Sequence, residues 1–228
     1  MERYVETIDD LMLGRKVAGG SCSDIYEMKS GLYFKKFCDD YCDLSDSINV
    51  EFLETIKTIS DIESLPFIVR AIDIYKNNEK LFGYSMNKVE ASVLEKVSDN
   101  VLIFDMLSAF DGLKIGIRNL SDSFVKTEDI GGDNILFNGN MYLLDLDLSL
   151  VDRRYVPDEL YQQTRNSVFR SVFYRMTGLR YVDDVINDDY LEYMKSFVDF
   201  CSNYSDFDVK SIGQLKIACQ KVYKKTIS

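Results

Sequence analysis

The tripeptide Asn138-Gly139-Asn140 joins two short apolar runs and limits more than any other feature how this chain can fold. Asn and Gly tolerate the positive φ of a tight chain reversal, so residues 135–137 and 141–144 are predicted to pair as an antiparallel β-hairpin. Such a hairpin places the residues before its first strand beside those that follow its second strand. The segment before residue 135 and the segment after residue 144 are therefore expected to lie close together.

Polar side chains occupy both ends of this predicted hairpin. Asp129 and Asn134 precede it, and Asp145 and Asp147 follow it. Carboxylate and amide oxygens without soft ligand atoms suit Mg²⁺ or Mn²⁺. The alternative is a solvated acidic turn, because 38 of the 228 residues are Asp or Glu.

Composition excludes several kinds of chemistry. The chain has no His, which rules out a Ser-His-Asp triad, a Cys-His pair and His-ligated zinc or haem. A net charge of −11 argues against a nucleic-acid partner and against an anionic membrane surface. No signal peptide opens the sequence and no apolar stretch is long enough to span a bilayer, so we expect a soluble protein. The five Cys include no C-x-x-C motif, which favours neither disulfides nor a zinc site and suggests a reducing, cytoplasmic setting.

The first third of the chain is predicted to be rich in β-strands. Residues 17–28 and 32–37 read as a hairpin, and residues 67–75 and 80–86 as a second strand pair. Between the pairs, apolar residues recur at helical spacing over residues 48–59.

The remainder is predicted to be mainly helical apart from the hairpin. Residues 101–120 form a long helical pattern, and the chain after Pro157 is expected to be helical to its end. The break between the two parts falls between Tyr84 and Ala91. We therefore predict an α+β fold with a β-rich N-terminal part and a helical C-terminal part.

The spacing around the hairpin resembles the catalytic segment of the protein kinase-like superfamily. Four residues separate Asp129 from Asn134, as in the family's H-R-D-x-x-x-x-N, and Asp145-Leu146-Asp147 stands at the family's D-F-G. The resemblance implies that Asp129 is the catalytic base that orients the acceptor hydroxyl. It also implies that Asn134 and Asp145 are metal ligands on the nucleotide phosphates, with Asp147 as a further candidate ligand.

This segment departs from the family pattern at several positions. Thr127 and Glu128 replace the family's His and Arg, and Gly131 replaces the Lys that neutralises the transferred phosphoryl group. Residues 167–178 resemble a helix of the family, although Thr164 stands in place of its anchoring Asp.

Further resemblances imply contacts to a nucleotide. The turn after residue 18 looks like the family's glycine-rich loop and keeps only its second glycine, so Gly20 and Ser21 would contact phosphates through their backbone. Residues 81–90 resemble the fifth strand and hinge. There Met86 would be the gatekeeper, and the Asn87 carbonyl and Val89 amide would bind the edge of adenine.

The run Leu32-Tyr33-Phe34-Lys35 resembles the family's V-A-I-K, which implies that Lys35 pairs with nucleotide phosphates and takes part in catalysis. A slip of one residue in strand register would select Lys36 instead. Glu51 and Glu54 lie one turn apart on the next predicted helix. We favour Glu54 as the partner of the lysine, and a solvated acidic face is the alternative for both glutamates.

The resemblance covers most of the chain and implies a two-lobed protein kinase-like fold. It would have a β-rich N-lobe (1–86), a hinge (87–90) and a truncated, mainly helical C-lobe (91–228) that contains the catalytic hairpin. The chain would be a minimal, atypical member of bacterial type, related to eukaryotic-like Ser/Thr kinases or to small-molecule kinases. The stretch from Asp145 to Pro157 is short for the segment with which such kinases dock peptides.

The expected function is transfer of the γ-phosphoryl group of ATP, with Mg²⁺ or Mn²⁺, to a hydroxyl of a small molecule or of a protein Ser/Thr. Two alternatives remain within the resemblance: a pseudokinase that binds a nucleotide or a partner without turnover, and a nucleotidyl transferase on the same fold. Outside it, the alternative is an acidic α/β scaffold without these motifs.

Overall fold

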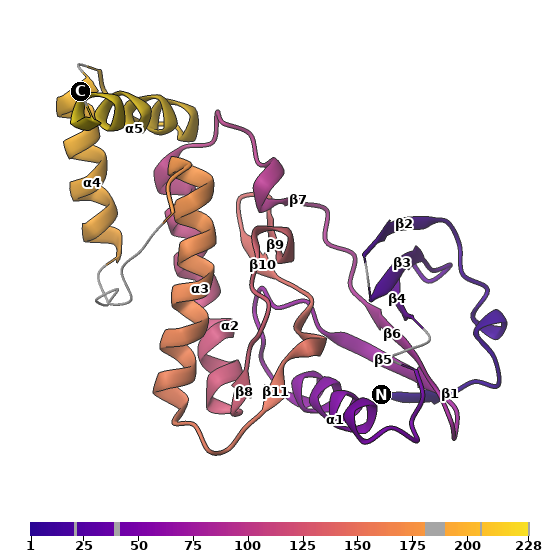
Figure 1. Cartoon of the computed structure of the whole chain (residues 1–228). Helices are drawn as coiled ribbons and strands as arrows, with labels where there is room; N and C mark the ends of the chain where they lie inside the picture. The colour runs from indigo at the N-terminus through magenta and orange to yellow at the C-terminus, as the bar shows by residue number, and fades with distance from the viewer. Residues whose placement is uncertain (21, 39–41, 181–189, 206, 228) are drawn as a thin grey trace.

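The computed structural model describes residues 1–20, 22–38, 42–180, 190–205 and 207–227, with side chains up to residue 223. It has the predicted α+β class. A β-sheet with one helix against it forms one end of the molecule, and the other long helices form the opposite end (Figure 1).

The first 86 residues contribute a six-stranded sheet in the order β1-β5-β6-β4-β3-β2. Its strands are β1 (Glu2–Tyr4), β2 (Lys16–Gly19), β3 (Ser23–Glu27), β4 (Tyr33–Phe37), β5 (Ala71–Lys76) and β6 (Leu81–Met86). All neighbouring strands are antiparallel except β1, which runs parallel to β5. The sheet places β4 between β3 and β6, away from both edges.

The sheet differs from the prediction in two places. The run expected as one strand over residues 17–28 is the β2–β3 hairpin, because the chain reverses where the Gly20 amide donates to the Ser23 carbonyl at 2.8 Å. The strand expected from residue 67 begins at Ala71, since Phe67 has a φ of 62° and does not continue a strand. The predicted turn before β4 is confirmed by Gly31, with a φ of 82°.

Helix α1 (Ser47–Asp61) confirms the helical pattern predicted over residues 48–59. It begins where the Asp46 carboxylate accepts a hydrogen bond from the Ile48 amide at 2.9 Å, which satisfies one of the free N–H groups of the first turn. Its apolar side packs on the sheet in a buried cluster made of Phe37, Cys42, Phe52, Leu53, Ile56, Ala71, Ile74, Leu81 and Tyr84.

Helices α2 (Ile103–Asp122), α3 (Pro157–Thr177), α4 (Tyr190–Ser205) and α5 (Ile212–Ile227) follow the sheet. Helix α3 begins with Pro157, whose missing N–H costs nothing in a first turn, and ends at Gly178, which has a left-handed φ of 73°. A second and larger apolar cluster lies among these helices and includes Phe110, Phe169 and Tyr190. The described core therefore falls into two clusters, one on the sheet and one among the helices.

The hairpin predicted at Asn138-Gly139-Asn140 is present as β9 (Ile135–Phe137) and β10 (Met141–Leu143), and Gly139 has a φ of 103°. It forms a small sheet with β7 (Ser92–Val93), and a separate pair joins β8 (Val125–Lys126) to β11 (Leu150–Val151). Short 3₁₀ turns η1 (Ile8–Leu11), η3 (Leu94–Lys96), η4 (Gly132–Asn134) and η5 (Leu146–Leu148) complete the described elements.

Strand β10 also bonds to the segment that leads into the large sheet. The Leu143 amide donates to the Phe67 carbonyl, and the Val69 amide donates to the Leu143 carbonyl, each at 2.9 Å. This bridge holds the end of the hairpin next to the sheet.

Residues 87–91, where the sequence predicts a hinge, follow β6 and form no helix or strand. The predicted division of the chain at this point stays a prediction. None of the helices in the described ranges has the length and apolar character needed to cross a lipid bilayer.

Gly83 of β6 lies in close contact with β4, and a substitution there tests this contact. Its φ is 146°, and a Cβ there would collide with the Lys35 carbonyl oxygen. We expect Gly83→Ala to lower the free energy of unfolding by about 2–4 kcal/mol, because it combines backbone strain with overpacking. Urea denaturation measures this loss. Gly20→Ala is the control, since nothing lies within 4 Å of a Cβ there; equal stability of the two variants would contradict the expected collision.

Candidate active site

The centre of the candidate site is a lysine buried in the middle of the large sheet. Lys35 lies on β4, opposite Ile25 of β3 and Tyr84 of β6, and is only 4% exposed. Successive residues of a strand point to opposite faces, so Lys36 faces away from this position. Of the two lysines that the sequence offered, the structure places Lys35 in the site.

Two carboxylates from beyond the hairpin neutralise Lys35. Its Nζ contacts Asp145 Oδ1 and lies 2.7 and 2.8 Å from the two carboxylate oxygens of Asp147. Asp147 also accepts a hydrogen bond of 3.3 Å from the Tyr84 hydroxyl. The Asp147 side chain is 5% exposed, whereas that of Asp145 is 39% exposed, so Asp145 is the carboxylate that a ligand can reach.

The environment of Tyr84 keeps its hydroxyl protonated. Burial and the neighbouring negative charge of Asp147 raise the pKa of Tyr84 well above its ordinary value. The hydroxyl therefore acts as a donor to Asp147 at any physiological pH. A lysine and a phenol together hold this carboxylate in one orientation.

The loop before the hairpin places Asn134 beside Asp145. The Asn134 side-chain amide donates to the backbone carbonyl of Asp129 at 2.7 Å, which leaves its oxygen as the remaining acceptor of that amide. The Leu144 amide donates to the Asn134 carbonyl at 3.1 Å. Asp145 follows Leu144 directly, so this hydrogen bond holds Asn134 and Asp145 at the same end of the hairpin. Asp129 is exposed and has a left-handed φ of 53°, which turns the loop at this residue.

A cavity of about 420 Å³ brings these groups together. The predicted site residues that line it are Gly20, Lys35, Met86, Asp129, Asn134, Asp145 and Asp147. The other lining residues are Ala18, Gly19, Cys22, Ser23, Ile25, Tyr84, Asp133, Leu144 and Leu148. The wall thus combines the β2–β3 turn and β4 with both ends of the β9–β10 hairpin.

Other predicted site residues lie elsewhere. The Glu54 carboxylate is 62% exposed and pairs with Lys57 Nζ at 2.7 Å; the ion pair expected between Glu54 and Lys35 is not formed in this structure. Helix α1 presents Glu54 to solvent, and Asp147 occupies the position beside the lysine. Asn87 and Val89 follow β6 and do not line the cavity, and Ser21 lies outside the described residues.

The accessible side-chain oxygens in the cavity fit part of the ligand set of a magnesium ion. Within the described ranges, no group of three or more Asp, Glu, Cys or His converges closely enough to hold a metal by itself. Mg²⁺ is usually bound through one or two protein carboxylates, with water and substrate phosphates as its other ligands. The accessible Asp145 carboxylate and the Asn134 amide oxygen form such a partial set. Asp147, with its oxygens engaged by Lys35 and Tyr84, fits an anchoring role better than that of a second ligand.

Two features of the site were not expected from the sequence. Tyr84 had no predicted role, although the register between the strand at 33–37 and that at 81–86 places it opposite Lys35. The hydroxyls of Thr127 and Thr164 lie 2.6 Å apart, which connects α3 to the segment leading to Asp129. Thr127 and Thr164 are two of the positions at which the chain departs from the kinase pattern.

No protein-family model matches this sequence, and no curated protein matches it at a significant level. The geometry of the cavity is therefore the basis on which a function can be argued.

The contribution of the buried ion pair between Lys35 and Asp147 to stability can be measured. We expect Asp147→Asn to lower the free energy of unfolding by about 3 kcal/mol, because removing one partner of a buried ion pair leaves the other uncompensated. Chemical denaturation measures the change. Asp133→Asn is the matched control in the same cavity, and its exposed carboxylate predicts a change within about 0.5 kcal/mol.

A double variant separates the ion pair from simple disruption of packing. Lys35→Met with Asp147→Leu removes both charges and keeps similar volumes, so it should recover most of the stability lost in Asp147→Asn. If Asp147→Asn is as stable as Asp133→Asn, the anchoring role of Asp147 is wrong.

Proposed function

We propose that this chain is a magnesium- and ATP-dependent phosphotransferase with a two-lobed protein kinase-like fold. One observation carries the proposal: Lys35 of the sheet contacts Asp145, 110 residues later, in a cavity that also receives Asn134 and Asp129. These are the four residues that the resemblance implies as phosphate clamp, metal ligands and base. Their convergence supports the proposal, because residues that matched the family pattern only by chance would not be expected to lie in one cavity.

The arrangement of the core also supports this fold. Most buried apolar side chains of α1 pack with the sheet in one cluster, Ile59 of α1 packs in the larger cluster with the other helices and the hairpin, and the cavity is lined from both parts of the chain. The contact between Thr127 and Thr164 adds to this support, because two departures from the family pattern bond to each other.

The proposed reaction is attack of an acceptor hydroxyl on the γ-phosphorus of ATP. Asp129 orients the hydroxyl and accepts its proton, while the bond from the γ-phosphorus to the bridging oxygen breaks and ADP leaves with that electron pair. Lys35 supplies a positive charge to the nucleotide phosphates. Asp145 and Asn134 would hold Mg²⁺, which neutralises the charge that develops on the phosphate oxygens.

Asp147 has a positioning role in this proposal. It holds Lys35 through two short contacts, so the ammonium group keeps its place when Asp145 turns to a metal ion. The acceptor is a hydroxyl of a small molecule or of a protein side chain.

A nucleotide-binding module without turnover is the second candidate, and Gly131 favours it. The loop between Asp129 and Asn134 has glycine where the family has a lysine that neutralises the transferred group. Nucleotidyl transfer is the third. The mass of the product distinguishes them, since a kinase adds phosphate, a nucleotidyl transferase adds AMP and a binding module adds nothing.

Nucleotide binding is tested by thermal unfolding with Mg²⁺ and ATP. ATP at 100 times its Kd should stabilise the wild type by about 2.7 kcal/mol, and Asp145→Asn should lose most of this gain because a metal ligand is removed. Asp133→Asn is the control and should keep the gain. Equal stabilisation of the two variants would show that Asp145 holds no metal.

Chemistry is tested separately with Asp129→Asn. This variant should keep the stabilisation by Mg²⁺ and ATP but transfer phosphate about 10²–10⁴-fold more slowly, because it lacks the proton acceptor. Transfer is followed by mass spectrometry of the products and by ADP release. If Asp129→Asn transfers phosphate at the wild-type rate, Asp129 is not the base. If the wild type binds Mg²⁺ and ATP but transfers no phosphate, the nucleotide-binding module is favoured.

A further inference from the structure

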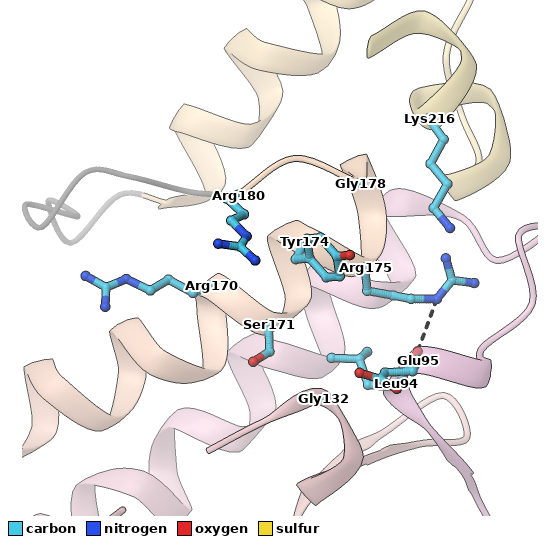
Figure 2. Close-up of a pocket in the computed structure, with 10 residues that line it drawn as sticks. All are labelled: Leu94, Glu95, Gly132, Arg170, Ser171, Tyr174, Arg175, Gly178, Arg180 and Lys216. Atoms are coloured by element: carbon cyan, nitrogen blue, oxygen red, sulfur yellow. Dashed lines mark hydrogen bonds between the residues drawn. The ribbon is translucent and has the colours of Figure 1, made fainter. Parts of the chain in front are cut away.

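A second cavity, of about 710 Å³, lies on the helical side of the molecule (Figure 2). It is bounded by α3 and the turn after it, by η3 and η4, and by α5. Its lining residues are Leu94, Glu95, Gly132, Arg170, Ser171, Tyr174, Arg175, Gly178, Arg180 and Lys216. We refer to it as the basic cavity.

The charge of the basic cavity is opposite to that of the whole chain. Four of its lining residues are basic and one, Glu95, is acidic, although the chain has a net charge of −11. Figure 2 shows that the basic groups come from different elements: Arg170 and Arg175 from α3, Arg180 from the chain beyond Gly178, and Lys216 from α5. This concentration of cations favours an anionic ligand.

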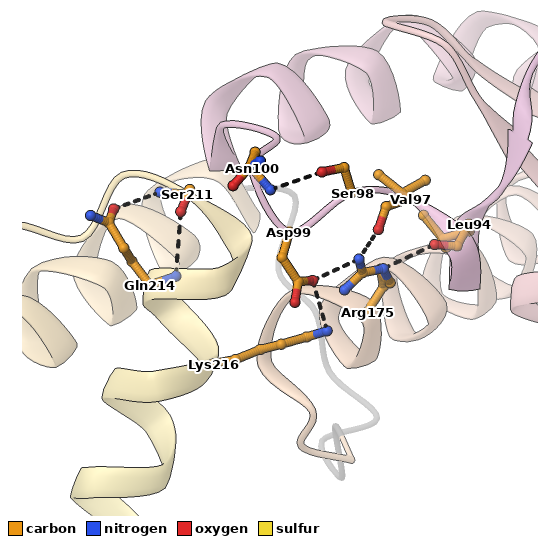
Figure 3. A network of polar contacts seen from close by, with 9 residues as sticks. All are labelled: Leu94, Val97, Ser98, Asp99, Asn100, Arg175, Ser211, Gln214 and Lys216. Atoms are coloured by element: carbon orange, nitrogen blue, oxygen red, sulfur yellow. Dashed lines mark hydrogen bonds and ion pairs between the residues drawn. The ribbon is translucent and has the colours of Figure 1, made fainter.

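Arg175 is the buried member of this group, and Figure 3 shows its polar contacts. Its Nε donates to the Leu94 carbonyl at 3.1 Å, and its Nη2 donates to the Val97 carbonyl and, at 2.8 Å, to Asp99 Oδ1. The side chain is 8% exposed, and its Nη1 is buried without a hydrogen-bond acceptor among the described residues. A buried guanidinium nitrogen without an acceptor is costly, and an oxyanion at this wall would be favoured by its charge.

One carboxylate serves two cations here. Asp99 Oδ1 also lies 3.2 Å from Lys216 Nζ, and the hydrogen bonds from Arg175 and Lys216 lower the pKa of Asp99. Asp99 therefore stays ionised yet offsets only one of the two positive charges. Arg180 adds a further basic side chain to the lining of the cavity.

The basic cavity adjoins the proposed catalytic loop. Gly132 lines it, while Asp129, Asp133 and Asn134 of the same loop line the cavity that holds Lys35. A Cβ on Gly132 would lie 3.0 Å from Glu95 Cγ, so the loop passes close to η3 at a residue that has no side chain. The two cavities thus share one loop as a wall.

We propose that the basic cavity binds a phosphate group of the hydroxyl acceptor, which makes the acceptor a phosphorylated small molecule. The part that concerns the acceptor rests on the proposed function, whereas binding of phosphate does not. A phosphate carries close to two negative charges and three acceptor oxygens, so it can be met by cations from several directions at once. A carboxylate offers two oxygens in one plane. The exposed ring of Tyr174 provides an apolar wall for the body of the acceptor.

Calorimetric titration with inorganic phosphate tests the proposal on the full chain. A chelator is present, so no metal-dependent phosphate binding at Asp145 contributes to the heat. We expect one phosphate per chain and about tenfold weaker binding in Arg180→Gln and in Lys216→Gln, because each loses a charge-assisted hydrogen bond. The matched control is Arg153→Gln, which removes the same charge at an exposed residue outside the cavity and should bind phosphate as the wild type does.

The outcomes separate this proposal from the proposed function. No binding of phosphate, or equal weakening in Arg180→Gln and Arg153→Gln, would overturn the basic cavity as a phosphate site. Citrate that binds when phosphate does not would overturn the choice of phosphate as the anion. Asp145→Asn should bind phosphate as the wild type does, although it loses the stabilisation by Mg²⁺ and ATP. Failure of the phosphate site and failure of the proposed metal site can therefore be told apart.

Discussion

The structure depends on the neutralisation of Lys35 in the middle of the sheet. A lysine that is 4% exposed cannot remain charged there without a partner, because the loss of hydration costs several kcal/mol. Asp147 supplies that partner from beyond the hairpin, and Tyr84 orients it. The ion pair therefore connects the sheet to the segment that follows the hairpin, and the candidate active site lies where these two parts of the chain meet.

Charge is distributed unevenly on the two sides of the loop that carries Asp129. One side holds the carboxylates around Lys35, where the proposed function would place a divalent cation. The other side holds the basic cavity, in which Arg175 and Lys216 share one carboxylate. The net charge of −11 gives no sign of this local excess of basic residues.

Much of the fold follows from local patterns that the sequence displays openly. The turn at Gly139, the start of α3 at Pro157 and the apolar spacing of α1 depend on residues close together in the chain, and each is present. Strand β1 was not predicted, because its three exposed residues have no pattern of their own and are held by parallel pairing with β5. Such non-local pairing leaves no periodic signal in a short strand.

By itself the sequence determined the hairpin and the polar residues at its ends, because turn chemistry and the two-residue period of a strand are local properties. Only the tertiary structure decided which carboxylate meets Lys35: the sequence suggested Glu54 or Glu51 as its partner and Asp147 as a metal ligand, and the structure pairs the lysine with Asp147. The basic cavity was also decided there. The spacing of its cations along the chain does not match one face of a helix, and only the packing of α3 against α5 brings Arg175 and Lys216 to one carboxylate.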